Sequence, residues 1–221
     1  MIFNVKILMM LFTRFCMKIL EVGGFKYLQL SWADIESLVE RLADKIISDY
    51  SPDILIGILR GGVTVAHLLS DVLGFRKIYP VGCSSYVDVA KRFSVKIYSP
   101  LALKDLSDKR VLLVDDVADE GLTLKGVIEQ EIAPKNPLEV RVATLHMKPW
   151  CKFKPDYYVE VTDAWIVYPW EKWEVVRQVA EGFIKNLGKE KGMDRLADLM
   201  EADVKKVQKV LASTRNPLLT G

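Results

Sequence analysis

The sequence VLLVDDVADEGLT occupies residues 111–123 and joins an apolar run to a glycine-containing turn through two adjacent acids. Four consecutive apolar residues without alternation are typical of a strand that is covered on both faces. Asp115 and Asp116 follow this strand directly, where paired carboxylates suit vicinal hydroxyls or a magnesium ion. Gly121 permits unusual backbone angles, so the amides of residues 118–123 can converge on an anion at the start of the next helix. The segment therefore predicts a diol site and a phosphate site in one loop.

A lone acidic pair before a helix more often caps that helix than binds a ligand. Here the acids, the glycine and the Thr123 hydroxyl occur together, and this combination favours a binding site. The chain contains neither the GxGxxG fingerprint of dinucleotide-binding proteins nor the GxxxxGK[ST] sequence of a Walker loop, so both of those phosphate-binding classes are excluded.

Similar apolar runs, each followed by a helical pattern, lie on both sides of this segment. The pattern predicts strands at Ile54–Leu59, Lys77–Val81, Arg110–Val114, Glu139–Leu145 and Tyr157–Val161. It predicts a first helix with apolar positions from Ile35 to Ile47, and further helices at Val63–Leu73, about Leu122–Ile132, and near Glu174–Leu187 and Asp194–Leu211. Strands that alternate with helices predict an α/β fold with a mostly parallel sheet flanked by helices, and ligands of such sheets bind beyond the carboxyl ends of the strands. A site is therefore expected in the loops 60–62, 115–123 and 146–150.

Two local features refine this outline. Ser31-Trp32-Ala33-Asp34 resembles a capping box and predicts the start of the first helix. The polar stretch from Gly82 to Lys96 has no sustained period and is interpreted as a long loop. A long loop in a compact domain is usually functional or disordered.

Composition limits the function classes. Half of the 221 residues are hydrophobic, which suffices for a sizeable core, and one α/β domain is the default for this length. The 31 Lys and Arg residues exceed the 29 Asp and Glu residues by 31 − 29 = 2, so no global positive field argues for a nucleic-acid partner. Any anionic ligand must therefore be bound by a local group of donors and not by the overall charge of the protein.

The cysteines and the N-terminal residues indicate the cellular compartment of the protein. Cys16, Cys83 and Cys151 form neither a CxxC pair nor a disulfide framework, and with only two histidines beside them a zinc cluster is not expected. Lysines and an arginine interrupt the apolar opening Met1–Leu20, so no membrane span is expected there. The opening is interpreted as an N-terminal extension, with Met17 as an alternative start. A cytoplasmic protein is predicted.

Residues 111–123 resemble the signature of the type I phosphoribosyltransferases, which has four apolar residues, two acids and a loop ending in Gly-x-Thr. By this resemblance Asp115 and Asp116 would bind the ribose hydroxyls of phosphoribosyl pyrophosphate, and the following loop would bind its 5′-phosphate. The loop residues are Ala118, Asp119, Glu120, Gly121, Leu122 and Thr123. Asp119 matches the family's acid near purine N7 and is a candidate proton partner.

One position departs from the family pattern. The loop reads ADEGLT where relatives often have VDTGGT, so Glu120 brings a carboxylate near a phosphate. Affinity would suffer unless the Glu120 side chain points outward.

Two further segments resemble parts of the same family. Arg60-Gly61-Gly62 resembles the pyrophosphate loop, because a close backbone approach needs glycine and a guanidinium suits a diphosphate. Alone, Arg-Gly-Gly would more often be an ordinary turn. Ser84-Ser85-Tyr86 followed by Lys91 and Arg92 resembles the flexible loop that closes over the reaction centre and excludes water. The resemblance makes Arg60, Lys91 and Asp119 the candidate catalytic residues.

The sequences ATLHMKP and WIVYPWE resemble the base pocket of the xanthine-guanine branch. By this resemblance Lys148 would donate to the 6-oxo group, Trp165 would stack on the base, and the backbone of Ile166 would read its 2-position. A lysine donor suits an oxygen and disfavours an amino group, which argues for an oxopurine over adenine. Glu171 stands where relatives have an acid near the base or the metal.

The resemblance implies the type I phosphoribosyltransferase fold with a small hood and extra C-terminal helices. It further implies transfer of ribose-5-phosphate from phosphoribosyl pyrophosphate to a 6-oxopurine (guanine, xanthine or hypoxanthine), with release of pyrophosphate and a purine nucleotide. Mg²⁺ is the implied cofactor, held by Asp115, Asp116 and Glu171, and a homodimer or larger homo-oligomer is expected. The expected division is an N-terminal extension at 1–24, the catalytic domain at 25–187 and a helical extension at 188–221.

Two alternatives remain open. One is a regulatory protein that senses phosphoribosyl pyrophosphate, for which the lysines of the last helix are the one supporting feature. The other is a transferase for another base, such as adenine or a pyrimidine, against which Lys148 and Trp165 argue.

Overall fold

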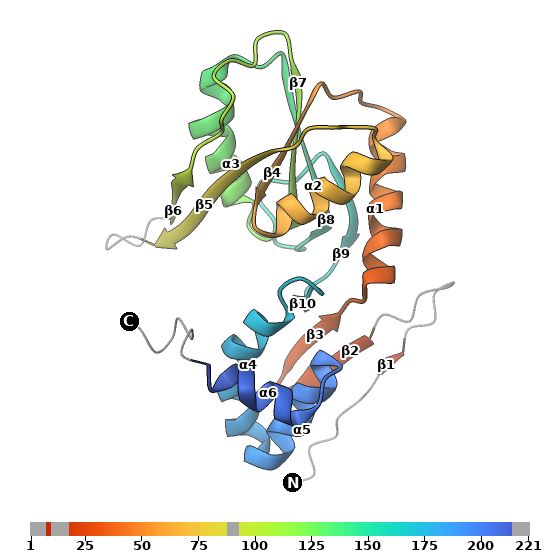
Figure 1. Ribbon diagram of the computed structural model, residues 1–221, viewed down its shortest axis with the longest axis vertical. Helices are drawn as coiled ribbons and strands as arrows, with labels where there is room; N and C mark the ends of the chain where they lie inside the picture. Colours follow the sequence, from red (N-terminus) through yellow and green to blue (C-terminus); the bar gives the residue numbers. More distant parts are fainter. Residues whose placement is uncertain (1–7, 10–17, 88–92, 214–221) are drawn as a thin grey trace. The chain divides into compact units, whose positions relative to one another are not determined.

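The computed structural model describes residues 8, 9, 18–87 and 93–213. Its contacts divide the chain into two compact units (Figure 1). Unit 1 combines the described residues of 1–34 with those of 164–221, and unit 2 comprises residues 35–163. Unit 1 is thus formed by the two ends of the chain, and unit 2 by the continuous segment between them.

Unit 2 is built on a six-stranded sheet in the order β6-β5-β4-β7-β8-β9. All neighbouring pairs are parallel except β5 with the edge strand β6. The strands are β4 (Ile54–Leu59), β5 (Tyr79–Val87), β6 (Phe93–Ser99), β7 (Arg110–Ala118), β8 (Glu139–Met147) and β9 (Tyr157–Val161). The predicted α/β class with a mostly parallel sheet is confirmed.

Strand β7 lies in the interior of this sheet. Its apolar residues Val111, Leu112, Leu113 and Val114 point alternately to opposite faces, as successive residues of a strand must. All four are 0% exposed. Both faces of the sheet are therefore covered at this strand, as the unbroken apolar run predicted.

Three helices accompany this sheet. They are α1 (Trp32–Ile47), α2 (Gly61–Val72) and α3 (Leu122–Val127), and α3 continues as a π-helical turn (Ile128–Ile132) and a 3₁₀ turn (Ala133–Lys135). Helix α2 contacts β4, β7 and β8, whereas α3 contacts β5, β6 and β7. The α1 residue Lys45 donates to the Tyr158 carbonyl of β9 at 2.8 Å. The predicted helix at 122–132 is confirmed in its extent, although only its first half is α-helical.

The predicted capping box is present at the start of α1. The Ser31 amide donates to Asp34 Oδ2 at 2.8 Å, and the Asp34 amide donates to Ser31 Oγ at 3.2 Å. Each side chain thus satisfies the other residue's backbone amide, which is how a capping box stabilises a helix start.

The long loop predicted from Gly82 to Lys96 is wrong for most of its length. Strand β5 continues to Val87, and β6 begins at Phe93 and pairs with β5 in antiparallel fashion. The described side chains of β6 are all intermediate or exposed, because β6 is an edge strand. An edge strand without a deeply buried face has no strong period for sequence reasoning to detect.

Unit 1 contains a second sheet in the order β1-β2-β3-β10. Its strands are β1 (Leu8–Met9), β2 (Lys18–Val22), β3 (Phe25–Gln29) and β10 (Trp165–Val167). None of these short strands was predicted from the sequence. Strand β10 pairs in parallel with β3, so Trp165 stands opposite Tyr27 although all of unit 2 separates them along the chain.

Three helices complete unit 1: α4 (Lys172–Leu187), α5 (Lys189–Met200) and α6 (Val204–Leu211). The single helix predicted at Asp194–Leu211 is wrong, because the helix is interrupted at Glu201, whose φ is +48°. Asp203 then caps α6 by accepting from the Lys206 amide at 2.8 Å. Since Asp is a preferred N-cap residue, Asp203 was the available sequence signal for this break.

The C-terminal helices contribute to the core of unit 1. Leu196 and Leu199 of α5 and Val207 of α6 are 0% exposed and belong to the same apolar cluster as Leu20 and Phe183. In the described part of the chain, no helix is both long and apolar enough to cross a bilayer.

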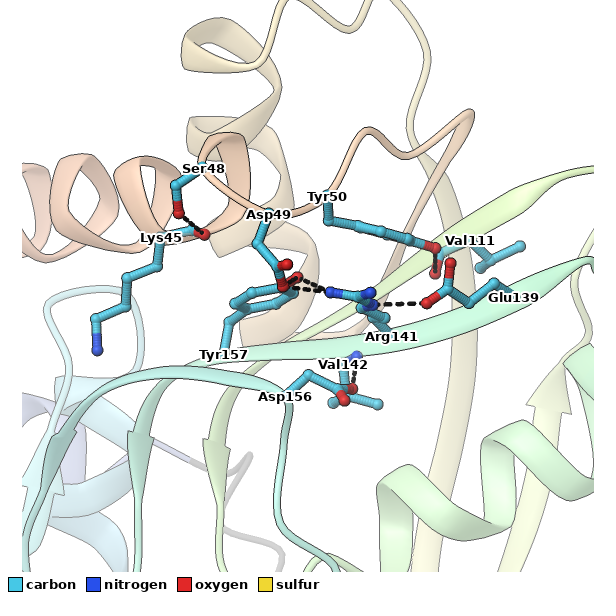
Figure 2. A network of polar contacts seen from close by, with 10 residues as sticks. All are labelled: Lys45, Ser48, Asp49, Tyr50, Val111, Glu139, Arg141, Val142, Asp156 and Tyr157. Carbon is cyan, nitrogen blue, oxygen red and sulfur yellow. Dashed lines mark hydrogen bonds and ion pairs between the residues drawn. The ribbon is translucent and has the colours of Figure 1, made fainter.

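A polar network closes unit 2 near the amino ends of β7, β8 and β9 (Figure 2). Arg141 donates to Asp49, to the Tyr157 hydroxyl and, at 2.7 Å, to Glu139. Its guanidinium carbon also lies 4.6 Å from the centroid of the Tyr50 ring. The hydrogen bond from Tyr157, followed by that from Arg141, lowers the pKa of Asp49. The network ties the residues after α1 to the sheet at the edge opposite the carboxyl ends.

Candidate functional site

The strand order reverses between β4 and β7. From β4 the chain passes through α2 to β5 on one side, whereas β7 lies on the other side and leads to β8. In open α/β sheets, ligands bind beyond the carboxyl ends of the strands at such a switch point. The predicted segment Arg60-Gly61-Gly62 follows β4, and the predicted segment 115–123 comprises the end of β7 and the loop after it.

These two loops are in close contact. A Cβ atom added at Gly61 would lie 1.7 Å from Asp116 Oδ2, and one added at Gly62 would lie 2.8 Å from Asp115 Oδ1. A larger residue at Gly61 would displace the Asp116 side chain, and one at Gly62 would also meet the Val114 carbonyl oxygen at 2.5 Å. The structure therefore explains the two glycines by the proximity of the acidic pair. Arg60 is exposed at the N-cap position of α2, after a cis Leu59–Arg60 peptide bond.

The acidic pair lies on strand β7 itself, because β7 extends to Ala118 rather than ending at Val114 as predicted. The Asp116 amide donates to Asp115 Oδ1 at 3.0 Å, and the Val117 amide donates to Asp116 Oδ1 at 2.8 Å. Both acids are partly exposed. They are thus held by their own backbone and remain accessible to a ligand.

A pocket of about 250 Å³ lies beside this pair. It is lined by Asp115, Val117, Ala118, Asp119, Glu120, Gly121, Leu122, Thr123 and Leu124. Gly121 has a φ of +80°, in the left-handed region that favours glycine. A Cβ atom there would also lie 2.2 Å from the Phe153 carbonyl oxygen. Gly121 is therefore required both by its backbone angle and by its neighbour.

The segment after β8 is bound to this loop through the backbone. The Lys148 amide donates to the Ala118 carbonyl at 2.8 Å, and the Lys152 and Phe153 amides donate to the Glu120 carbonyl at 3.1 and 3.2 Å. The predicted loops 115–123 and 146–150 therefore lie side by side.

Glu120 forms an ion pair with Lys152, with 2.9 Å between Oε2 and Nζ. The Glu120 side chain is 48% exposed and the Lys152 side chain 74%. The extra carboxylate in the loop was predicted from the sequence, but Lys152 as its partner was not. The ion pair partly compensates the negative charge that Glu120 brings to the loop.

Lys148 is 9% exposed at the end of β8. Burial lowers its pKa, and the carboxylates of Asp119 and Asp163 oppose that shift. Asp119 is exposed and accepts a hydrogen bond from the Trp150 indole at 2.6 Å. Trp150 was not predicted as a site residue, although its place two residues after Lys148 was a usable signal.

The described cysteines do not have the properties of nucleophiles. Burial, followed by the charge of Asp115, raises the pKa of Cys83 to about 11. Burial also raises the pKa of Cys151, whose thiol donates to the Phe153 carbonyl at 3.2 Å. A protonated thiol is a poor nucleophile, so neither cysteine is suited to covalent catalysis.

The other predicted site residues lie elsewhere. Ser84, Ser85 and Tyr86 are on β5, and Ser84 is exposed, while Lys91 lies outside the described residues. Trp165 and Ile166 are on β10 in unit 1 and are 48% and 6% exposed. Glu171 occupies the N-cap position of α4 in the same unit. A base pocket that combines Lys148 with Trp165 therefore stays a prediction.

Across residues 8, 9, 18–87 and 93–213, no three His, Cys, Asp or Glu side chains gather in a way that could hold a metal ion. Asp115 and Asp116 offer adjacent, partly exposed carboxylates. Mg²⁺ is commonly bound through one or two carboxylates together with substrate phosphates and water. The pair fits a magnesium ion that arrives with a phosphorylated substrate.

Three comparisons with known proteins agree with this geometry. The family model "Phosphoribosyl transferase domain" matches residues 30–181. The xanthine-guanine phosphoribosyltransferase of Gluconobacter oxydans (strain 621H) is 31% identical over 150 residues, covering 66% of this chain and 84% of that protein. The purine phosphoribosyltransferase structure from Pyrococcus horikoshii is 40% identical, with a TM-score of 0.59 and coverage of 65% of this chain and 93% of that one.

A further solved structure covers more of the chain. A hypothetical protein from Neisseria gonorrhoeae with bound ppGpp is 26% identical, with a TM-score of 0.60, and the match covers 79% of this chain and 96% of that chain. The family match includes every strand end from Arg60 to Lys148 that contributes to the site in unit 2.

Proposed function

We propose, from the premise that the chain belongs to the phosphoribosyltransferase family, that it transfers ribose-5-phosphate from phosphoribosyl pyrophosphate to a 6-oxopurine in purine salvage. As a member of this family, the chain is a pentosyltransferase. The products of the proposed reaction are pyrophosphate and a purine nucleotide. Guanine, xanthine and hypoxanthine are the candidate bases.

One observation carries the proposal: the contact between the Arg60-Gly61-Gly62 loop and the acidic pair. Asp116 Oδ2 lies where a side chain at Gly61 would begin, so the two loops share one edge of the sheet. A diphosphate group beside Arg60 and a ribose beside Asp115 and Asp116 would therefore lie close enough to be parts of one ligand. Phosphoribosyl pyrophosphate has these two groups joined at C1′.

The proposed mechanism uses positioning and charge stabilisation. Asp115 and Asp116 accept hydrogen bonds from the ribose hydroxyls, and the 118–123 loop binds the 5′-phosphate. Arg60 and Lys91 then stabilise the departing pyrophosphate while the base nitrogen attacks C1′. Fixing the reactants in this way removes much of the entropic barrier, and no covalent nucleophile is needed. A magnesium ion, when bound, offsets negative charge on the leaving group.

The base is recognised in the proposal by Lys148 and Asp119. The Lys148 ammonium donates to the 6-oxo group, and Asp119 exchanges a proton at N7. Trp150 contacts both residues, since its indole donates to Asp119 at 2.6 Å and its ring centroid lies 5.7 Å from Lys148 Nζ, which supports a shared binding place for one edge of the base. Trp165 and Ile166 would supply stacking and backbone contacts from β10.

Two other functions are tested by the same assay. A sensor of phosphoribosyl pyrophosphate would bind that ligand without turnover, and a transferase for another base would use adenine or uracil. The purified protein is incubated with magnesium, phosphoribosyl pyrophosphate and each of hypoxanthine, guanine, xanthine, adenine and uracil, and nucleotide formation is followed. We expect turnover with oxopurines. An absence of turnover with every base would refute the enzymatic proposal.

The variant Lys148→Ala tests the base assignment. It should raise KM for the oxopurine at least about tenfold and change the affinity for phosphoribosyl pyrophosphate by less than about threefold, because a charged hydrogen bond is lost only on the base side. Steady-state kinetics with each substrate varied in turn measure both effects. Equal losses for both substrates would contradict the assignment of Lys148.

A further inference from the structure

Trp150 lies on a segment that is fixed against the phosphate loop. The Lys148 amide donates to the Ala118 carbonyl at 2.8 Å, and the Lys152 amide donates to the Glu120 carbonyl at 3.1 Å. The backbone on both sides of Trp150 is thereby held relative to residues 118–120. The position of the indole is thus set by the site and not by a free loop.

The indole makes two polar contacts. Its Nε1 donates to Asp119 Oδ1 at 2.6 Å, and its ring centroid lies 5.7 Å from Lys148 Nζ. The second distance is within the range of a cation–π interaction. Trp150 is 49% exposed, so burial in a core does not account for a tryptophan at this position.

The two partners of Trp150 are the groups that the proposed function assigns to one edge of the base. N7 and the 6-oxo group are neighbours on a purine. The indole N–H binds Oδ1 of Asp119, and the Lys148 ammonium lies within cation–π range of the indole ring. One side chain therefore sets the spacing of a carboxylate and an ammonium.

We propose that Trp150 is a positioning residue that holds Asp119 and Lys148 in register for the N7 and 6-oxo edge of a purine. This inference rests on the proposed function. Trp150 thereby contributes to selection of 6-oxopurines over 6-aminopurines. The 6-oxo group accepts a hydrogen bond from a correctly placed ammonium, whereas a 6-amino group is itself a donor.

The kinetic test compares Trp150→Phe, which keeps an aromatic ring and removes the indole N–H, with Trp150→Ala. The control is Trp32→Phe, since Trp32 is 56% exposed and lies in unit 1. We expect Trp150→Phe to raise KM for hypoxanthine about tenfold, the usual scale for a hydrogen bond to a charged group, while KM for phosphoribosyl pyrophosphate changes less than about twofold. Trp150→Ala should raise KM for hypoxanthine further, because it also removes the ring that faces Lys148. Equal changes in the two KM values, or none, would overturn the inference.

A second test needs no turnover. The five tryptophans give five indole N–H resonances in a nitrogen-15 correlation spectrum, and Trp150→Phe identifies that of Trp150. Asp119→Ala should shift this resonance, whereas Asp105→Ala should not, because the Asp105 carboxylate accepts hydrogen bonds from Ser107. Calorimetry should show at least about fivefold weaker GMP binding by Trp150→Phe, with unchanged ribose 5-phosphate binding, since one charged hydrogen bond is lost on the base side.

The outcomes separate the two proposals. One outcome is that the wild-type protein converts no base but binds GMP more tightly than Trp150→Phe does. This outcome would refute the enzymatic function and support the positioning role. Wild-type turnover with an unshifted Trp150 resonance in Asp119→Ala would overturn the positioning role alone.

Discussion

Gly61 and Gly62 show how single residues determine the geometry of the site. The backbone at the start of α2 approaches Asp115 and Asp116 so closely that a Cβ atom at Gly61 would overlap with Asp116 Oδ2. The side chain that the family resemblance assigns to the ribose is therefore positioned by the absence of a side chain on the neighbouring loop.

Gly61→Ala should weaken binding of phosphoribosyl pyrophosphate at least about tenfold, because Asp116 must move to admit the methyl group and a charged hydrogen bond is lost. Calorimetry measures this affinity. The control is Gly182→Ala, since a Cβ atom at Gly182 meets nothing within 4 Å. It should leave binding unchanged and stabilise α4 by up to about 1 kcal/mol. Wild-type affinity in Gly61→Ala would show that the position of Asp116 is unimportant.

His146 is a second residue whose behaviour follows from its surroundings. It is 0% exposed on β8, and burial, followed by the charge of Lys148, lowers its pKa to about 3. In the unfolded chain its pKa is about 6.5. Between these values the unfolded chain binds a proton that the folded protein does not, so stability falls as the pH decreases from about 6.5 to 3, by at most about 1.4 kcal/mol per pH unit.

The chain has two histidines, so His67→Gln leaves His146 as the only imidazole. We expect its ring resonances to stay constant from about pH 8 to about pH 5 in the folded protein, because the folded pKa lies well below this range. A titration midpoint near about pH 6.5, the value of an ordinary histidine, would contradict the neutral, buried state.

At the scale of elements, the loop after β7 and the segment after β8 act as one structure. Backbone hydrogen bonds and the Glu120–Lys152 ion pair join them. Both side chains are largely exposed, so the pair should contribute little to stability. Its expected effect is on the charge beside the phosphate pocket.

Lys152→Ala should weaken phosphoribosyl pyrophosphate binding several-fold, because it leaves the Glu120 carboxylate uncompensated near an anion. Glu120→Thr should bind at least as tightly as wild type, and the double variant should recover the loss caused by Lys152→Ala. A double-mutant cycle with measured dissociation constants tests this coupling. Additive effects of the two substitutions would refute it.

At the scale of the whole molecule, each unit has its own core. The core of unit 1 combines strands β2 and β3 from the start of the chain with helices α4, α5 and α6 from its end. Stability of this unit therefore depends on its C-terminal helices, although α5 and α6 lie beyond the family match.

Leu196→Ala should destabilise unit 1 by about 2–5 kcal/mol, the usual cost of removing a buried leucine side chain. Hydrogen exchange should show loss of protection in β2, β3 and α4. Leu138→Ala is the control, because Leu138 is 66% exposed and its truncation should cost less than about 0.5 kcal/mol. Unchanged protection in β2 and β3 would show that α5 is not part of this core.

The interior elements were predictable because burial leaves a strong pattern. Strands β4 and β9 have the predicted bounds, and α1 begins at the predicted capping box. The edge strand β6, the short strands of unit 1 and the break at Glu201 were missed. Their patterns are weak because they are short or partly exposed, or because the break depends on one backbone angle.

The sequence by itself determined the α/β class, the phosphoribosyltransferase family and the acidic segment at residues 111–123, since these depend on local apolar runs and a contiguous signature. Only the tertiary structure brought Gly61 against Asp116, Lys152 to Glu120 and Trp150 to Asp119. Each of these contacts joins loops that are separated along the chain and meet because parallel strands end at one edge of a sheet. A contact between such distant loops cannot be predicted from a local sequence pattern.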